Sequence, residues 1–333
     1  MIRIGKPLRI SKKDNLVDSA ASKSGDNICP KCGNTDFSYD SFWDESCCRQ
    51  CGWILPGNKV NEIKSEQSHL QSGEQQGFRK KEITSDDSKF SYSRISLFKN
   101  CPKAYHFKYI LRKEELFSSI EQHLGKSIHT ALENAYRKKG GDEGNISLNY
   151  LLKAFDQAWN SPERENVRVI KKNTEPRDYY SDGQDMLKKY YYRVMVPDRS
   201  QTVALEKYFE ITIGDSLRYR GYIDRISKNP NGLLRITDFK SGKRVNEPLE
   251  DMQLCSYALW CFDEFKVNEI EIAFEALRHG RTLCGIKKRS QIPIINKKLI
   301  TDINSVMTAT AFEARPSILC NWCGYNSLCE QAM

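Results

Sequence analysis

The chain has 333 residues, a formal net charge of +9 and a hydrophobic content of 39%. The length fits about two domains, while the hydrophobic content lies below the ~45–50% usual for soluble proteins. No stretch approaches the ~18 consecutive apolar residues of a membrane span, and no G-x-x-x-x-G-K-[ST] motif is present, so neither a membrane protein nor an NTPase motor of that type is predicted.

Two C-x2-C pairs stand near the N-terminus, fifteen residues apart. Cys29 and Cys32 form the first pair and Cys48 and Cys51 the second, and a glycine follows each pair. No apolar secretory segment precedes them, so metal binding is favoured over disulfides. Four thiolates suit tetrahedral Zn²⁺. Cys47 adjoins Cys48, but ligation by Cys47 would break the C-x2-C spacing.

Residues 28–56 resemble the zinc ribbon of archaeal and eukaryotic transcription factor B, through the two cysteine pairs and the sequence Cys-Gly-Trp-Ile-Leu at 51–55. Such ribbons more often dock proteins or nucleic acid than catalyse. Residues 1–27 and 57–89 contain few apolar side chains, so we expect a flexible tail before the ribbon and a flexible linker after it. We expect an intracellular, cytoplasmic protein, associated with the nucleoid if prokaryotic.

The remaining chain, 90–333, alternates helical and strand patterns. Helices are expected up to Trp159 and near 184–194, and strands near 202–213, 217–226, 233–239, 269–277 and 282–287, with further helices over 251–262 and from 297 onward. This order predicts an α/β domain with a central mixed sheet flanked by helices.

One predicted hairpin carries two carboxylates and a lysine. Asp238 and Lys240 are two residues apart, so a strand presents both on one face. Asp224 ends the preceding strand, and residues 229–232 (Asn-Pro-Asn-Gly) form a turn signal between them. The carboxylates can share a divalent cation with Lys240 beside it, as metal-dependent phosphodiester cleavage requires. The plain alternative is a surface hairpin with solvated charges.

Two helices carry further polar residues. The first is predicted to open at Gly125, with Ile128, Ala131, Leu132 and Ala135 at helical spacing and His129 on its polar side. On the 251–262 helix, Gln253 and Tyr257 lie one turn apart on one face.

These motifs, in this order, resemble the RecB-like branch of the PD-(D/E)XK nuclease superfamily, which has a restriction-endonuclease-like core. The resemblance covers Ser91 to Cys329 and implies a catalytic Lys240. It implies that the ligands of Mg²⁺ or Mn²⁺ are His129, Asp224 and Asp238. Gln253 and Tyr257 correspond to DNA-positioning residues, and Glu206 matches an acidic position on the preceding strand.

A second set of cysteines closes the chain with C-x2-C-x5-C spacing: Cys320, Cys323 and Cys329. Three thiolates leave a site one ligand short, and Cys101, which precedes a proline, is the candidate fourth. Zinc is the plain interpretation, whereas a subset of RecB-like nucleases binds a 4Fe-4S cluster at these positions. The remaining cysteines have no partner spacing and are expected to be buried: Cys255, Cys261 and Cys284.

The positive charge is uneven, because residues 90–333 carry +8 of the +9. Basic residues interleave with aromatic ones, for example around Tyr190, Tyr191 and Tyr192. Such a surface suits a polyanion, in particular a single strand whose bases can stack, although a tyrosine stripe is more often core packing.

The sequence therefore predicts a Mg²⁺- or Mn²⁺-dependent DNA nuclease that prefers single strands, flaps or ends, and exonuclease mode is expected. By the same resemblance it would act in DNA repair, recombination or CRISPR adaptation. Two alternatives stay open: a non-catalytic factor that docks nucleic acid or protein through its ribbon, and a processing factor that acts only within a larger complex.

Overall fold

The computed structural model describes Thr35, residues 37–40, 45–48 and 54–55, and residues 89–332 without 141–145, 162–165 and 215. The chain divides into two compact units, Met1–Gln67 and Ser68–Met333. In the first unit, β1 (Phe37–Asp40), β2 (Glu45–Cys48) and β3 (Ile54–Leu55) form an antiparallel sheet in that order.

The second unit is built on a mixed sheet with the order β11-β10-β9-β8-β4, and β7 pairs with β8. β9 and β10 are parallel, as are β4 and β8, whereas the other neighbours are antiparallel. The bounds of these strands are β4 (Lys89–Phe90), β7 (Gln201–Ile213), β8 (Leu217–Lys228), β9 (Leu234–Lys240), β10 (Glu269–Ala276) and β11 (Arg281–Lys288). Lys89, predicted to end the linker, is thus the first residue of β4.

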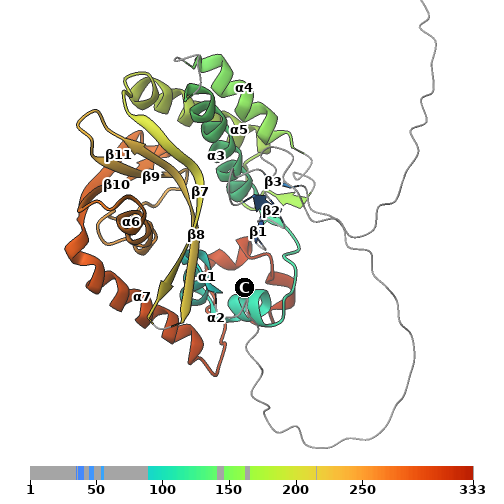
Figure 1. Cartoon of the computed structure of the whole chain (residues 1–333). Coiled ribbons are helices and arrows are strands. Elements are labelled where there is room, and N and C mark those ends of the chain that lie inside the picture. The colour runs from blue at the N-terminus through green and yellow to red at the C-terminus, as the bar shows by residue number, and fades with distance from the viewer. Residues whose placement is uncertain are drawn as a thin grey trace, which may run out of the picture. The chain divides into compact units, whose positions relative to one another are not determined.

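Helices cover both faces of this sheet (Figure 1). α3 (Ile120–Lys139), α4 (Leu148–Trp159) and α5 (Pro176–Tyr190) pack together on one side, around a core that includes Ile128, Phe155 and Phe239. α6 (Met252–Phe265) and α7 (Ile292–Met307) cover the other side. The predicted α/β class with a central mixed sheet is confirmed.

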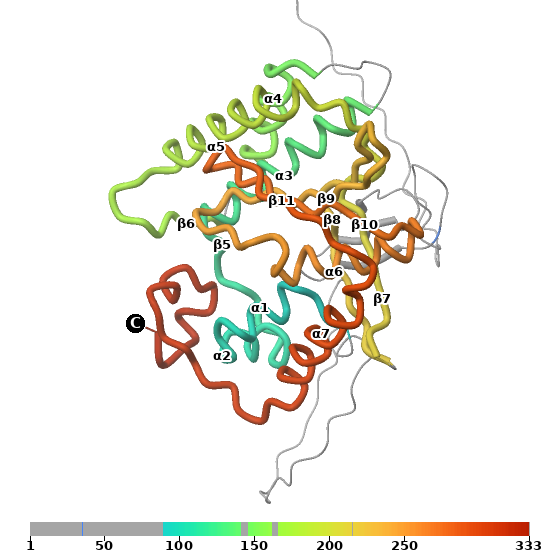
Figure 2. Tube along the Cα trace, turned by 90° about the vertical axis from the view of Figure 1, so that its left-hand side faces the viewer, coloured from blue at the N-terminus to red at the C-terminus, as the bar shows by residue number. Residues whose placement is uncertain are grey.

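Shorter elements join these layers, and Figure 2 shows α1 and α2 beside the C-terminal segment. They are α1 (Tyr92–Asn100), α2 (Pro102–Tyr105), the π-helical turns η1 (His106–Ile110) and η3 (Tyr191–Met195), β5 (Ser118–Ser119), β6 (Val167–Arg168), and the 3-10 turns η4 (Leu277–His279), η5 (Arg289–Gln291), η6 (Ile318–Trp322) and η7 (Asn326–Leu328).

The helix α3 begins earlier than predicted. Ser119 and Gln122 form a capping box, in which the Gln122 amide donates to Ser119 Oγ at 3.3 Å and the Ser119 amide donates to Gln122 Oε1 at 2.9 Å. Gly125 therefore lies inside the helix. A Cβ at Gly125 would lie 3.3 Å from Ser241 Oγ, so glycine permits close approach of α3 to the end of β9.

Two further helices begin earlier than the sequence predicts. α5 begins at Pro176 rather than near 184, and α7 begins at Ile292, with Pro293 in its first turn, rather than at Lys297. Proline is favoured at the first helical positions because its missing N–H has no helical partner there. The predicted strands agree with the observed ones within two residues at each end.

The predicted hairpin turn between β8 and β9 is confirmed. The Gly232 amide donates to the Asn229 carbonyl oxygen and the Asn229 amide to the Leu233 carbonyl oxygen, both at 2.8 Å. Gly232 has φ +88°, a conformation that side-chain-bearing residues rarely adopt. The turn fixes the register of the strands that carry Asp224 and Asp238.

The cysteines without partner spacing divide between interior and surface. Cys255 and Cys261 are buried in α6, as expected, but Cys284 is exposed. Cys284 lies on β11, the edge strand of the sheet, where one face is not covered by a helix. Its predicted burial is therefore wrong.

Candidate active site and cysteine pocket

The β8–β9 hairpin brings two predicted carboxylates together. Arg225 of β8 lies opposite Thr237 of β9, so Asp224 and Asp238 occupy the next position along the pair. There the Phe239 amide donates to Asp224 Oδ2 at 2.7 Å. The Asp224 side chain thus takes a main-chain donor where the regular strand pairing ends. Asp224 and Asp238 are 8% and 2% exposed.

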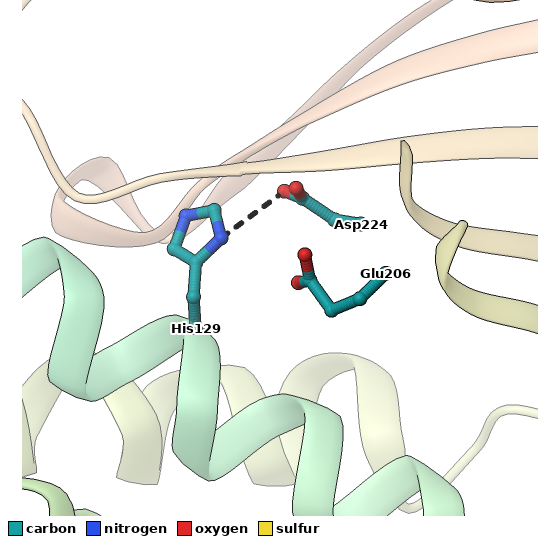
Figure 3. A group of neighbouring side chains, drawn as sticks. All are labelled: His129, Glu206 and Asp224. Carbon is teal, nitrogen blue, oxygen red and sulfur yellow. Dashed lines mark ion pairs between the residues drawn. The ribbon is translucent and has the colours of Figure 1, made fainter. Parts of the chain in front are cut away.

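His129 of α3 faces the same carboxylate. Its Nε2 donates to the Phe239 carbonyl oxygen at 2.7 Å, and its Nδ1 lies 3.4 Å from Asp224 Oδ2 (Figure 3). In the protonated ring Nδ1–H pairs with Asp224, whereas in the neutral ring Nδ1 is an acceptor or a metal ligand. Burial acts to lower the pKa of His129, but Asp224, Glu206 and Asp238 together raise it to about 10.

Glu206 of β7 completes a compact cluster. One ligand atom from each of His129, Glu206 and Asp224 lies within 4.8 Å of the others, and Figure 3 shows the three side chains converging. Glu206 has φ +43°, a left-handed conformation that costs a residue with a side chain about 1–3 kcal/mol. Burial, followed by the charge of Asp224, raises the pKa of Glu206 well above its usual value.

A polar chain runs from β9 into α6. Lys240 Nζ lies 2.7 Å from Asp238 Oδ2 and donates to Gln253 Oε1 at 2.8 Å. Gln253 Nε2 in turn donates to the Tyr257 hydroxyl at 2.7 Å. These contacts hold the ammonium of Lys240 at the end of β9.

The pKa values along this chain reflect burial and charge. Burial and the charge of Asp224 raise the pKa of Asp238 to about 6, although Lys240 acts in the opposite direction. Burial would lower the pKa of Lys240, but Asp238 raises it above its usual value. Lys240 is therefore an ammonium at neutral pH.

The structure thus brings the predicted site residues into one region, with two differences in their arrangement. The compact cluster contains Glu206, whereas Asp238 is engaged by Lys240. Tyr257 is 4% exposed, and its hydroxyl accepts a hydrogen bond from Gln253. It therefore holds the Gln253 side chain in place and does not reach the surface. The main chain of Phe239 binds both His129 and Asp224. This role could not be predicted from the residue type, because it depends on the strand register.

The residue after Asp224 anchors β8 to its surroundings. Arg225 is 4% exposed, and its guanidinium lies over the Tyr136 ring of α3 at 3.8 Å. Its Nη2 donates to Asp198 Oδ2 at 2.8 Å. Burial alone would raise the pKa of Asp198, but Arg225 and hydrogen bonds from Ser200 lower it.

The C-terminal cysteines meet Cys101 at a second place. The thiols of all four cysteines line one cavity: Cys101, Cys320, Cys323 and Cys329. The aromatic rings of Phe107 and Tyr325 line it as well. Burial raises the pKa of Cys323, and Cys101 and Cys320 are among the neighbours that raise it further.

This cysteine pocket is tied to the segment that leads into α3. The Leu116 amide donates to the Gly324 carbonyl oxygen and the Tyr325 hydroxyl to the Lys113 carbonyl oxygen, each at 3.1 Å. Trp322 Nε1 donates to Glu121 Oε2, also at 3.1 Å. The last residues of the domain therefore contact the start of the helix that carries His129.

The N-terminal cysteine set lies largely outside the described residues. Cys29, Cys32 and Cys51 are outside them, and Cys48 is described only as the last residue of β2.

Comparison with known proteins identifies the larger unit. A family model for the PD-(D/E)XK nuclease superfamily matches residues 89–330. The chain belongs to this superfamily. Nucleases of the superfamily typically use Mg²⁺ or Mn²⁺ and act on DNA, so membership indicates a metal-dependent nuclease.

The PD-(D/E)XK match stands beside two partial likenesses. A short N-terminal stretch is 44% identical over 39 residues to transcription initiation factor IIB 1 of Thermococcus kodakarensis, which is 12% of this chain and 13% of that protein. A solved structure described as SSO0001 is 14% identical, covers 72% of this chain and 94% of its own, and has a TM-score of 0.28. Among the described residues, no helix is long and apolar enough to cross a membrane.

Proposed function

We propose that residues 90–333 form a Mg²⁺- or Mn²⁺-dependent deoxyribonuclease that hydrolyses phosphodiester bonds, preferring single strands, flaps or ends. The observation that carries this proposal is the pairing of a buried carboxylate–imidazole cluster with the Lys240 ammonium beside Asp238. The proposed setting is DNA repair, recombination or CRISPR adaptation, and the proposed mode is exonucleolytic.

The donor set fits a divalent cation. Asp224, Glu206 and His129 converge from three elements and are buried or half-buried, and like charges at such spacing repel unless protons or a cation neutralise them. We propose that these residues hold the metal, with Asp238 as a further ligand once its carboxylate turns from Lys240. A bound Mg²⁺ or Mn²⁺ supplies Lewis-acid stabilisation of a phosphoryl oxygen and activation of water.

Lys240 supplies a fixed positive charge. Contacts with Asp238 and Gln253 restrain its side chain, and a preorganised ammonium stabilises charge that develops on a phosphoryl group during attack. In this proposal Gln253 positions Lys240 and the incoming strand, while Tyr257 holds Gln253.

The charge distribution favours an unpaired strand. Residues 90–333 carry an excess of +8, and the chain contains no G-x-x-x-x-G-K-[ST] motif that would indicate a motor able to open a duplex. Tyr192, in the basic-aromatic segment, is 64% exposed, although Tyr190 is 1% exposed and belongs to the core. Single strands and frayed ends should therefore be cut ahead of blunt duplex.

We propose a 4Fe-4S cluster for the cysteine pocket. Four thiols from opposite ends of the domain line one cavity, and Cys-only ligation suits either an iron–sulfur cluster or zinc. The resemblance to RecB-like nucleases favours the cluster. Its role would be structural, because the pocket contacts the segment leading into α3.

We propose that residues 28–56 form a zinc ribbon held by Cys29, Cys32, Cys48 and Cys51. The support is the spacing of the pairs, the likeness to transcription initiation factor IIB 1 and the antiparallel sheet β1-β2-β3. The ribbon would dock a protein or nucleic-acid partner, joined to the nuclease domain by a linker within 57–89.

The test compares end-labelled single-stranded, flapped and blunt DNA with Mg²⁺ or Mn²⁺ at several salt concentrations. We expect metal-dependent cleavage in the order single strand, flap, duplex, and binding that weakens as salt rises. Equal rates on blunt duplex and single strand would contradict the substrate preference. No cleavage of any substrate with either metal would overturn the enzyme assignment and favour a ribbon-based docking factor.

A further inference from the structure

A second cavity, of about 400 Å³, lies at the start of α6, next to the turn whose Gln253 side chain contacts Lys240. It is formed between α1, the loop before α6 and α7, and its wall includes Tyr92, Tyr219, Glu247, Glu250, Asp251 and Leu299. Figure 2 shows α1 and α7 side by side at this end of the sheet. The volume is sufficient for one nucleobase together with its sugar.

The cavity wall is connected to Lys240 through two hydrogen bonds. The Gln253 main-chain N–H donates to Asp251 Oδ1 at 2.9 Å, and the Gln253 side-chain Oε1 accepts from Lys240 at 2.8 Å. Tyr92 lies on the opposite wall. Burial and the charges of Asp251 and Asp238 raise the pKa of its hydroxyl, while the charge of Lys240 acts to lower it. Gln253 therefore links the cavity wall to Lys240, through its main chain on one side and its side chain on the other.

The lining excludes a phosphate. Glu247, Glu250 and Asp251 bring negative charge, and the one lysine of the lining, Lys99, is paired with Asp302 at 2.6 Å. A phosphate would meet repulsion there, whereas a neutral ligand with N–H donors would meet acceptors.

One buried hydroxyl in the wall lacks a hydrogen bond of good geometry. Tyr219 is 1% exposed, and its hydroxyl has no such partner among the described residues. Ser256 is its polar neighbour, but the Ser256 hydroxyl donates to the Gln253 carbonyl oxygen at 2.7 Å. A buried hydroxyl without a good partner is costly, and a polar ligand in the cavity would satisfy it.

From these contacts we infer that the cavity is a subsite for one unpaired base of the DNA strand, a base that carries an exocyclic amino group. The two tyrosines and Leu299 offer a wall for a flat ring. The exposed carboxylates of Glu247 and Glu250 accept from the amino group, as a carboxylate does from the amino group of cytosine, and the strand's phosphates stay outside on the Lys240 side. The inference deepens the proposed nuclease function and rests on it. Thymine, which lacks an amino group, should be the poorest occupant.

The test places a single modified nucleotide at successive positions of an otherwise fixed single-stranded oligonucleotide. Adenine is compared with purine, which lacks only the amino group. Binding to the full chain is measured without added divalent cation, and cleavage is measured with Mn²⁺. We expect one position near the cut at which loss of the amino group weakens binding and kcat/KM about tenfold.

Variants assign that effect to the cavity. Glu250→Gln replaces one rim carboxylate by a neutral amide of the same shape. Tyr219→Phe removes the buried hydroxyl. Each variant should reduce the difference between adenine and purine to less than threefold. Glu264→Gln, a substitution of an exposed residue near the end of α6, is the matched control and should keep the full difference.

The outcomes separate this inference from the proposed function. Cleavage that is indifferent to the amino group at every position would overturn the subsite and leave the nuclease in place. Absence of cleavage would overturn the nuclease, and the binding measurement would then decide the subsite alone. Displacement of the oligonucleotide by N-acetylarginine amide in the parent, lost in Glu250→Gln, would instead identify a pocket for a basic side chain of a protein and overturn the inference.

Discussion

The carboxylate cluster and the cysteine pocket gather their ligands by different means. Asp224 and His129 both bond to the main chain of Phe239, and the sheet beneath them lies between two buried hydrophobic clusters. Their positions follow from the sheet, so the cluster is arranged before any cation binds. Such preorganisation favours catalysis because the groups need not reorganise during the reaction.

The cysteine pocket relies on short elements from distant parts of the chain. Cys101 lies between α1 and α2, and its partners lie on or beside the 3-10 turns η6 and η7. The apolar cluster there has few buried members, Ala104, Phe107 and Tyr325. A bound group at this place would contribute to folding itself, as metal sites in small elements do. Loss of a ligand should therefore reduce activity at the first site and stability at the second.

The sharpest test of this contrast is Lys240→Ala. Removal of the ammonium should lower the cleavage rate by about 10²–10³-fold, while the melting temperature changes little, because Asp238, with a pKa of about 6, can take up a proton. Lys228→Ala, at the exposed far end of β8, is the control. Cleavage and circular dichroism melting are measured on both proteins. Retained activity in Lys240→Ala would contradict the assignment of Lys240 as the catalytic lysine.

Cys323→Ser should have the second largest effect, on stability and metal content. Anaerobically purified parent protein should be brown, and the variant should lose iron and sulfide, keep zinc and melt at a lower temperature, since a cluster ligand is gone. Cys284→Ser, at an exposed thiol outside the pocket, should keep both metals. Elemental analysis that finds two zinc ions and no iron in the parent would replace the cluster with a second zinc site.

Asp198→Asn removes the ion pair with Arg225 that anchors β8, the strand that carries Asp224. It tests how much this ion pair adds to the stability that the sheet provides. The pKa of Asp198 is lowered in the folded protein, so its ion pair with Arg225 stabilises the fold above the unfolded value of ~3.9 and is lost as pH falls through the folded value. At pH 7 the variant should be less stable by about 2 kcal/mol, and the difference should shrink below pH 4.

Urea unfolding at pH 7, 5, 4 and 3 measures that difference. The matched control is Asp182→Asn, which removes an exposed partner of Arg278 and should cost less than about 1 kcal/mol. A cost for Asp198→Asn that stays constant down to pH 3 would show that the ionised carboxylate is not what stabilises β8.

The smallest expected effect concerns metal choice at the first site. Mn²⁺ should support cleavage at least as well as Mg²⁺, by up to about tenfold, because an imidazole ligand suits Mn²⁺ better than Mg²⁺, which prefers oxygen ligands. Rates measured over a titration of each metal test this. Activity with Mg²⁺ alone would count against His129 as a ligand.

Most of the architecture and the identity of the candidate ligands could be predicted from local sequence patterns. Alternating and helical apolar patterns located the strands of the sheet within two residues, and the turn at Gly232 set the hairpin that pairs β8 with β9. These features are local, since they depend on side-chain period and on backbone conformations that glycine permits. The starts of α5 and α7 differ from the expected ones because a proline in the first turn, Pro176 or Pro293, begins each helix ahead of its apolar period.

The arrangement of the candidate ligands depends on contacts between distant parts of the chain. The left-handed Glu206, the double role of the Phe239 main chain and the engagement of Asp238 by Lys240 depend on how β7, β8, β9 and α3 meet. The cavity at the start of α6 likewise joins residues from α1, β8 and α7. Such contacts join residues far apart in the chain, and their distances follow from packing, which a local sequence pattern does not encode.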